Sequence, residues 1–239
     1  MIRTLLLTGL IALAAPAAVL AQTRSEGTFD LVLRGLTAGQ LTFSGVENGR
    51  SYAVRGVLKS GGLVAMVRKV RYDAEVEGTV AGPRLSPARY REDADTGKRQ
   101  STSVMRWVRG VPQVESATPV RAPRPNDVDP ATQKGTVDPL TALYATLRDV
   151  PAAEVCTTNV TMFDGRRRSE LRLSAPVTQG ERVTCSGEYR RIAGFSDKEM
   201  AEKVRFPFTL TYAPAGEGRM RVVEVAMDTL YGKATLKRR

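Results

Sequence analysis

Acidic side chains are the groups best able to do chemistry in this sequence, because its 239 residues include no histidine and only two cysteines. Two clusters stand out: Glu92, Asp93 and Asp95 before a Thr–Gly turn, and the alternating Asp73, Glu75 and Glu77. Two carboxylates converging across a sugar could hydrolyse a glycosidic bond, and a cluster could hold a hard cation. We expect instead a solvated turn and an exposed strand face, with no catalytic residue and no metal site.

Other catalytic signatures are missing from the sequence. Without histidine, imidazole-dependent triads, haem ligation by histidine and Cys/His zinc sites are excluded. There is also no Gly-x-Ser-x-Gly elbow, Ser-x-x-Lys pair, Walker loop or Gly-x-Gly-x-x-Gly fingerprint. We therefore predict a protein that is not an enzyme and carries no cofactor.

Basic side chains outnumber acidic ones, 36 Lys and Arg against 25 Asp and Glu, for a net charge of +11. The candidate anion-binding residues form two clusters: Arg68, Lys69 and Arg71, and Arg166, Arg167 and Arg168. The second cluster follows a predicted hairpin turn, so we expect it to be exposed. The charge favours an acidic amphiphile or another envelope anion as partner, with peripheral membrane contact. Nucleic acid is rejected because no module signature is present.

Residues 1–21 have the pattern of a secretory signal peptide. A positive start at Arg3 precedes an apolar run over residues 4–20, and small residues flank a predicted cut after Ala21. Neither this run nor any later one reaches the ~18 apolar residues of a spanning helix. We predict a soluble periplasmic protein in which residues 22–239 form one β-rich domain; loss of Arg3 lowers its net charge from +11 to +10.

Cys156 and Cys185 are expected to form a disulfide after export to an oxidising compartment. A simple meander over 155–192 would leave them two strands apart, roughly 9–10 Å, whereas a disulfide needs Cα atoms within about 7 Å. Three explanations stay open: Cys156 precedes the paired region, the strands are not consecutive neighbours, or the thiols are free. We favour the disulfide and doubt the meander.

Most of the chain alternates apolar and polar residues with the period of a β-strand. We expect about a dozen strands, including 29–33, 101–108 and the pair 155–163 and 166–174 around a two-residue turn at Asp164–Gly165. The Pro-rich stretch 118–135 is expected to be a loop within one sheet rather than a domain linker. These patterns predict a mainly β fold: a strongly curved antiparallel sheet or incomplete β-barrel with one amphipathic helix packed on it.

That helix begins at Asp138, a good N-cap, followed by Pro139. Its apolar stripe consists of Leu140, Leu143, Tyr144 and Leu147. We expect residues 138–148 to pack against the concave side of the sheet and to serve as a mobile lid over an apolar cavity. The inward-facing candidates for the lining are medium-sized: Leu31, Leu33, Leu41, Val54 and Met66.

The last third of the chain resembles a known family. Its motifs are similar to those of the DUF3108 group of exported bacterial proteins: the run Cys185–Phe195, Phe206–Pro–Phe and Gly232–Lys–Ala–Thr. Two earlier segments share this similarity, Asp138–Pro139–Leu140 and the strand–turn–strand from Leu31 to Phe43. The resemblance implies a signal peptide and a β-rich domain, and defines no functional residue. A weaker, fold-level likeness is to the open barrels of the Lol lipoprotein carriers and the sigma-factor regulator RseB.

These observations lead to three hypotheses of function. The first is an envelope protein that binds an amphiphilic, lipid-like ligand or a lipoprotein partner. The second is a hydrolase of envelope glycan acting through carboxylates such as Glu92 and Asp93. The third is a scaffold that holds protein partners through exposed strand edges.

Overall fold

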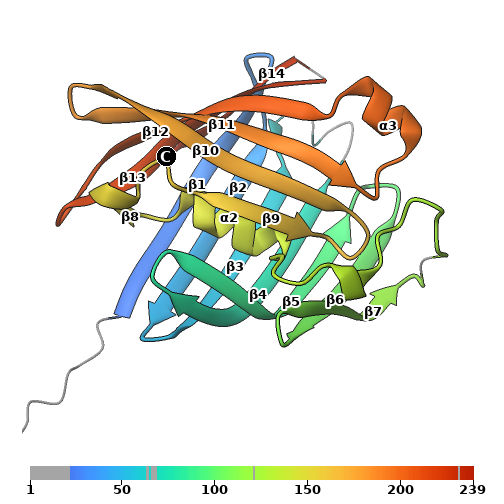
Figure 1. Ribbon diagram of the computed structural model, residues 1–239. Helices are drawn as coiled ribbons and strands as arrows, with labels where there is room; N and C mark the ends of the chain where they lie inside the picture. The colour runs from blue at the N-terminus through green and yellow to red at the C-terminus, as the bar shows by residue number, and fades with distance from the viewer. Residues whose placement is uncertain (1–21, 63–64, 66–68, 121, 231) are drawn as a thin grey trace, which may run out of the picture.

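A computed structural model describes residues 22–239 except 63–64, 66–68, 121 and 231 (Figure 1). The predicted signal peptide, Met66 and Arg68 lie outside the described residues. The strands of the first half are β1 (Gln22–Leu33), β2 (Leu36–Asn48), β3 (Ser51–Ser60), β4 (Arg71–Ala81), β5 (Arg84–Asp95), β6 (Gln100–Val108) and β7 (Val111–Thr118). Those of the second half are β8 (Val150–Pro151), β9 (Asn159–Phe163), β10 (Arg168–Gln179), β11 (Arg182–Ala193), β12 (Arg205–Gly216), β13 (Arg219–Thr229) and β14 (Gly232–Arg238). The helices are η1 (Pro130–Thr132), α2 (Pro139–Leu147), η2 (Ala152–Glu154) and α3 (Asp197–Glu202).

One antiparallel sheet contains all fourteen described strands. Strands β1 to β7 pair in sequence order, as do β9 to β14, and β1 pairs with β14 to join the two halves. Short β8 pairs with β13. The sheet curls into a nearly closed barrel (Figure 1), so the predicted fold class is confirmed. The strands on either side of residues 118–135 belong to the same sheet.

The Pro-rich stretch and the residues after it close the seam between the edge strands β7 and β9. The Gly135 N–H donates to the Gly110 carbonyl after β6 at 2.8 Å. On the other side, the Val137 N–H donates to the Thr161 carbonyl at 2.9 Å, and the Phe163 N–H donates to the Val137 carbonyl at 2.8 Å. The segment thus supplies hydrogen bonds that a missing strand would otherwise make.

Helix α2 lies inside the curved sheet, where Figure 1 shows it surrounded by strands. Leu140, Tyr144 and Leu147 are buried in the main core, and Leu143 is partly buried against it. Thr141 and Thr146, off the apolar stripe, are buried as well. The expected packing of the helix on the concave side is observed, and its role as a mobile lid stays a prediction. The helix is an internal plug, because a sheet this wide cannot be filled by its own medium-sized side chains.

Ion pairs fix the chain where it leaves α2. The buried Arg148 guanidinium lies 2.8 Å from the Glu47 carboxylate on β2. The next residue, Asp149, accepts two hydrogen bonds from Arg221 on β13, the shorter being 2.6 Å. Arg148, Glu47 and Asp149 are largely buried, so loss of a partner would leave a buried charge less well compensated, and these contacts help to hold the plug in one position.

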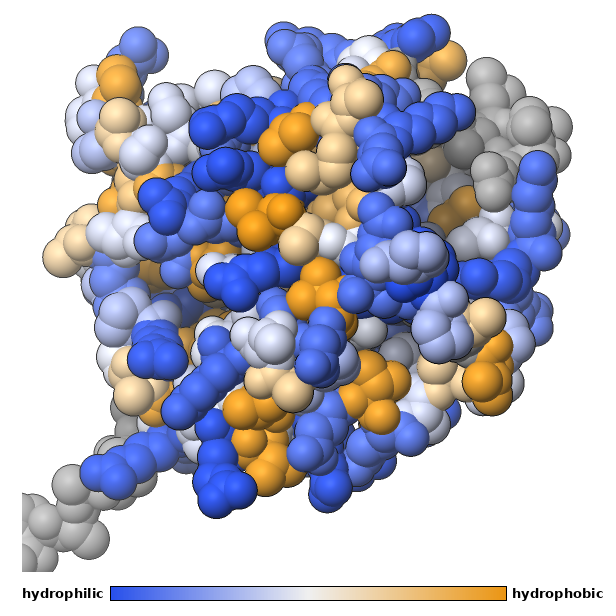
Figure 2. Space-filling model, turned by 45° about the vertical axis from the view of Figure 1, so that its right-hand side comes forward, coloured by the Kyte–Doolittle hydropathy of each residue, from blue (hydrophilic) through white to orange (hydrophobic). Residues whose placement is uncertain are grey.

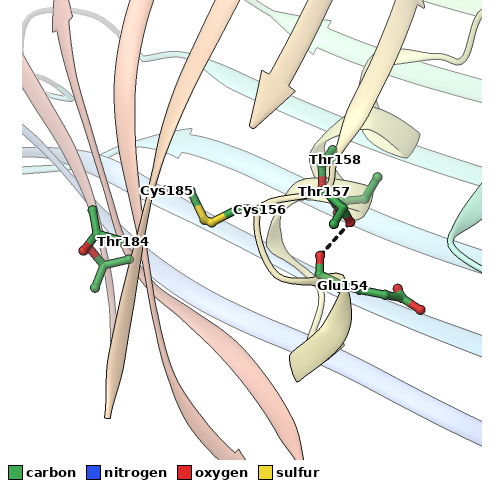
Figure 3. Close-up of a disulfide and its surroundings, with 8 residues drawn as sticks. Glu154, Cys156, Thr157, Thr158, Thr184 and Cys185 are labelled. Atoms are coloured by element: carbon green, nitrogen blue, oxygen red, sulfur yellow. Dashed lines mark hydrogen bonds between the residues drawn. A yellow bond between two sulfur atoms is a disulfide. The ribbon is translucent and has the colours of Figure 1, made fainter. Parts of the chain in front are cut away.

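The disulfide joins Cys156, in the loop before β9, to Cys185 on β11 (Figure 3). Their Cα atoms lie 5.4 Å apart. Strands β9, β10 and β11 are consecutive neighbours, so the doubt about the meander was wrong. The first explanation holds: β9 begins only at Asn159, and Cys156 precedes the paired region. The loop that carries Cys156 can therefore pass over β10, which brings Cys156 to Cys185 on β11.

The turn predicted at Asp164–Gly165 is longer than expected. Phe163 pairs directly with Arg168, which leaves a four-residue loop. The Asp164 carboxylate accepts hydrogen bonds from the N–H groups of Arg166 and Arg167 at 2.9 and 2.8 Å. An Asp side chain that caps its own loop in this way stabilises the wider turn.

The fit of α2 against β2 makes a testable prediction. A Cβ at Gly45 would overlap the ring of Tyr144, which is fully buried. We expect Gly45→Ala to lower the free energy of unfolding by about 1–3 kcal/mol through overpacking. Gly61→Ala, just after β3, is the matched control, because its Cβ would meet only backbone atoms of Gly39 at ordinary contact distances of 3.4 Å or more and none of α2. Equal loss of stability in both variants, measured by urea unfolding, would contradict the plug arrangement.

Candidate functional site

An apolar pocket of about 440 Å³ occupies the part of the barrel interior that α2 leaves unfilled. Its walls come from β1 to β5, β13 and β14, and its lining is almost entirely aliphatic and aromatic. The side chains that define it include Leu31, Leu58, Tyr72, Met227 and Leu236. Leu140 and Leu143 of α2 close it on the side facing the rest of the core.

The pocket lies next to one end of the barrel. Leu31 is two residues from the end of β1, Leu58 is two residues from the end of β3, and Met227 is two residues from the end of β13. These ends lie together because β3 pairs with β2, β2 with β1, and β14 links β1 to β13. The rest of α2, from Tyr144 onward, extends toward the opposite end, where Tyr144 donates a hydrogen bond to Glu47 at 3.0 Å.

Two of the lining residues expected from the sequence, Leu31 and Leu41, are in this pocket. Val54 is buried in the main core, and Leu33 is partly exposed beyond the pocket at the end of β1. Sequence reasoning missed Tyr90, although strand alternation places it on the same face as Glu92 two residues on.

Glu92 is the charged residue in the lining of this pocket. The Tyr90 hydroxyl donates to Glu92 Oε2 at 2.7 Å. Burial, together with the neighbouring Glu92 charge, raises the pKa of Tyr90 well above its usual value. Tyr90 therefore stays a hydrogen-bond donor at neutral pH. Glu92 Oε1 has no hydrogen-bond partner among the described residues, so one carboxylate oxygen is available to a ligand group that donates.

A second set of hydrogen-bonded polar side chains supports the floor of the pocket. Asp138, fully buried, accepts from the N–H of Thr141 at 2.8 Å and from its hydroxyl at 2.5 Å. Because the Thr141 hydroxyl already donates its one proton to Asp138, the Tyr52 hydroxyl must donate to the Thr141 oxygen, 2.7 Å away. Burial raises the pKa of Asp138 from 3.8 to about 6, despite these hydrogen bonds. This chain fixes the start of α2, and hence Leu140 and Leu143 at the pocket floor.

The carboxylates proposed as a catalytic pair do not converge. Glu92 lines the internal pocket, whereas Asp93 lies on the outer surface of the sheet, as successive residues of a strand must. Asp73 and Glu75 are also on the outer surface, where Arg55 lies 3.5 Å from each. Glu92 and Asp93 therefore cannot act together on one bond.

The basic clusters proposed to bind anions are largely engaged within the protein. Arg166 pairs with Asp127 at 3.2 Å, and Arg167 pairs with Glu199 at 3.2 Å while lying over the Phe195 ring. Arg168 donates to the Gln133 side chain at 3.4 Å. All three are partly buried, so the expectation that they are exposed was wrong. The reason is that their loop packs against residues 118–137 and α3 rather than projecting into solvent.

In the first basic cluster, Arg71 pairs with Asp73 at 2.6 Å. Lys69 is exposed at the end of the barrel near the pocket. Across the described residues, no group of three or more His, Cys, Asp or Glu side chains is placed to hold a metal ion. Within the same part of the chain, no helix has the length and apolar character needed to cross a membrane.

A second space, of about 580 Å³, follows the seam beside β9, but its lining mixes polar and apolar side chains. Four of its charged side chains pair with one another: Arg148 with Glu154 at 3.5 Å, and Arg172 with Glu170 at 2.7 Å. The apolar pocket is therefore the better candidate for a ligand site, because apolar enclosure with few polar groups is typical of such sites.

The buried Asp138 predicts a pH-dependent effect on stability. Because its folded-state pKa, about 6, lies above the ordinary 3.8, the folded protein favours the protonated form. That stability is fully present below pH about 4 and is lost as the pH rises through about 6, up to about 3 kcal/mol. Asp138→Asn keeps the N-cap without the charge. We expect the variant to gain stability relative to wild type between pH 4.5 and pH 7.5 in urea unfolding; a pH-independent difference would contradict the assignment.

Comparison with known proteins places these features in a family. The model of the family "Protein of unknown function (DUF3108)" matches residues 28–196. A solved structure, the beta-barrel-like protein of domain of unknown function DUF1849 from Brucella abortus, is similar in fold, with a TM-score of 0.50 and 14% sequence identity. The similarity covers 92% of this chain and 97% of that one.

The comparison with curated proteins found no match. The resemblance noted in the sequence is confirmed by the family model, which spans more than half of the chain and includes α2, the disulfide and most of the pocket walls. The chain therefore belongs to the DUF3108 family.

Proposed function

We propose that this protein binds an apolar or amphiphilic molecule in the pocket beside α2, without catalysing a reaction. The observation that carries the proposal is the pocket itself: about 440 Å³ of space with an almost entirely apolar lining, next to the packed core around α2. Ligand sites commonly span about 300–1,000 Å³ and combine apolar walls with a few polar groups. Glu92 and Tyr90 supply such groups at one wall.

The outer surface gives less support for an apolar ligand. On the face shown in Figure 2, hydrophilic side chains predominate and the hydrophobic ones form separate small areas. An apolar molecule would gain more from the enclosed pocket, because the favourable free energy of burial rises with the apolar area removed from water.

We further propose that the protein works in the bacterial periplasm. The disulfide between Cys156 and Cys185 is compatible with an oxidising compartment. The amino-terminal pattern of residues 1–21 supports export, with cleavage after Ala21. An envelope location would bring the pocket close to lipids and lipoproteins, the ligand and partner classes that suit it.

Filling the pocket tests this function. Ala74 on β4 lines the pocket, so Ala74→Phe should occupy space that a ligand needs. Ala53→Phe is the matched control, because Ala53 is exposed on the outer face of β3. We expect mass spectrometry of the gently purified protein to find a co-purifying amphiphile in wild type and in Ala53→Phe. We expect Ala74→Phe to retain at most about a tenth of it, because the added ring replaces ligand contacts.

Two results would contradict the proposal. One is a wild-type protein free of amphiphile whose melting temperature does not change when detergents or lipids are added. The other is equal ligand content in both phenylalanine variants. Either outcome would leave the scaffold hypothesis, in which partners pair with the edge strands β7 or β9.

A further inference from the structure

Two exposed leucines lie at the end of the barrel that is nearest the pocket. Leu36, the first residue of β2, is 58% exposed, and Leu230, in the turn after β13, is 39% exposed. Exposure to water is unfavourable for large aliphatic side chains at turn tips, and moving them into an apolar medium lowers the free energy. Single exposed apolar residues are common on proteins, so their position relative to other features decides whether they matter.

The turns that carry these leucines are neighbours in space. Strands β1 and β14 pair antiparallel, which brings the β1–β2 turn beside the β13–β14 turn at the top of Figure 1. The Arg34 N–H donates to the Lys233 carbonyl at 2.9 Å, and the Arg34 side chain packs against Gly232. The two turns therefore present one composite tip with a leucine on each side.

The composite tip borders the pocket. Leu31 and Leu236, which line the pocket, pair with each other two residues below Leu33 and Ala234. Leu33 in turn pairs with Leu36. The exposed tip is thus only a few residues along β1 and β2 from the pocket wall.

Both basic and acidic residues lie around this end. Lys59 at the end of β3, Lys69 before β4 and Lys233 at the start of β14 are exposed. The acidic residues near the same ends are Asp228 on β13, Asp93 and Asp95 on β5, and Asp73 on β4, which pairs with Arg71. Basic residues beside exposed aliphatic ones are the combination that binds anionic lipid bilayers, since the positive charges are attracted to the headgroups while the apolar side chains insert between them.

We propose that this end of the barrel docks on an anionic lipid bilayer. Leu36 and Leu230 insert into the bilayer, and the lysines contact its headgroups. The proposal rests on the proposed function, because the bilayer would be the source or the destination of the amphiphile in the pocket. A bilayer fits better than a protein partner for two reasons. The exposed apolar area consists of two leucines, which is small for a protein interface, and the pocket lies at the same end of the barrel.

Vesicle sedimentation tests the docking surface. We expect the wild type to bind vesicles of phosphatidylglycerol and phosphatidylcholine, and to bind pure phosphatidylcholine vesicles weakly. Raising the salt from 0.05 M to 0.5 M should weaken binding to the anionic vesicles. The double variant Leu36→Ser/Leu230→Ser should lose affinity by about tenfold or more. Val177→Ser is the matched control: Val177 is 55% exposed but lies on β10 near the opposite end.

The proposal is overturned if the wild type binds neither kind of vesicle, or if the double variant binds as well as Val177→Ser does. Circular dichroism confirms that each variant is folded. The pocket variant Ala74→Phe should still bind anionic vesicles, because it leaves the tip unchanged. Vesicle binding without any co-purifying amphiphile would thus disprove the proposed function alone, and amphiphile without vesicle binding would disprove the docking surface alone.

Discussion

The burial of α2 inside the curved sheet is the constraint on which the rest of the structure depends. A barrel of this width has more interior than its own medium-sized side chains can fill, and unfilled apolar space loses packing contacts. Tyr144 and Leu140 supply the missing volume, and Gly45 and Gly56 on the facing strands make room for them. The backbone groups at both ends of a helix placed there need hydrogen-bond partners. Asp138 supplies one at the start, and at the other end the Tyr144 carbonyl accepts from the Arg148 N–H and the Ala145 carbonyl from the Thr158 hydroxyl.

The plug also explains why the pocket is where it is. Nine helical residues are too short to fill the whole interior, so the core is packed around Tyr144 and Leu147 and left open beyond Leu140 and Leu143. The residues that stabilise the fold thereby set the floor of the candidate ligand site. A change at the Asp138–Thr141–Tyr52 chain would alter the pocket through the helix, without touching a ligand.

Charge in this protein has two different roles. Arg148 and Arg166 are held in ion pairs that connect distant segments, where desolvation makes each pair hard to break and gives little free charge to a partner. The net charge of +11 therefore overstates what a ligand would meet. Next to the pocket, the exposed lysines Lys59, Lys69 and Lys233 are available for binding.

The sequence alone determined the strand-rich class and the helix at 139–147 with its Asp138 cap, because each depends on local spacing. It also indicated the cysteine pair, because the chain has only two cysteines and a predicted export signal. Only the tertiary structure decided that the helix is internal: an apolar stripe looks the same on a surface lid as on a plug. It also decided that Glu92 and Asp93 face opposite sides, and that Arg166 and Arg167 are engaged with residues far along the chain. A local pattern shows which side of an element is apolar. What covers that side depends on the pairing of segments as distant as Phe29 and Arg238, which no local pattern contains.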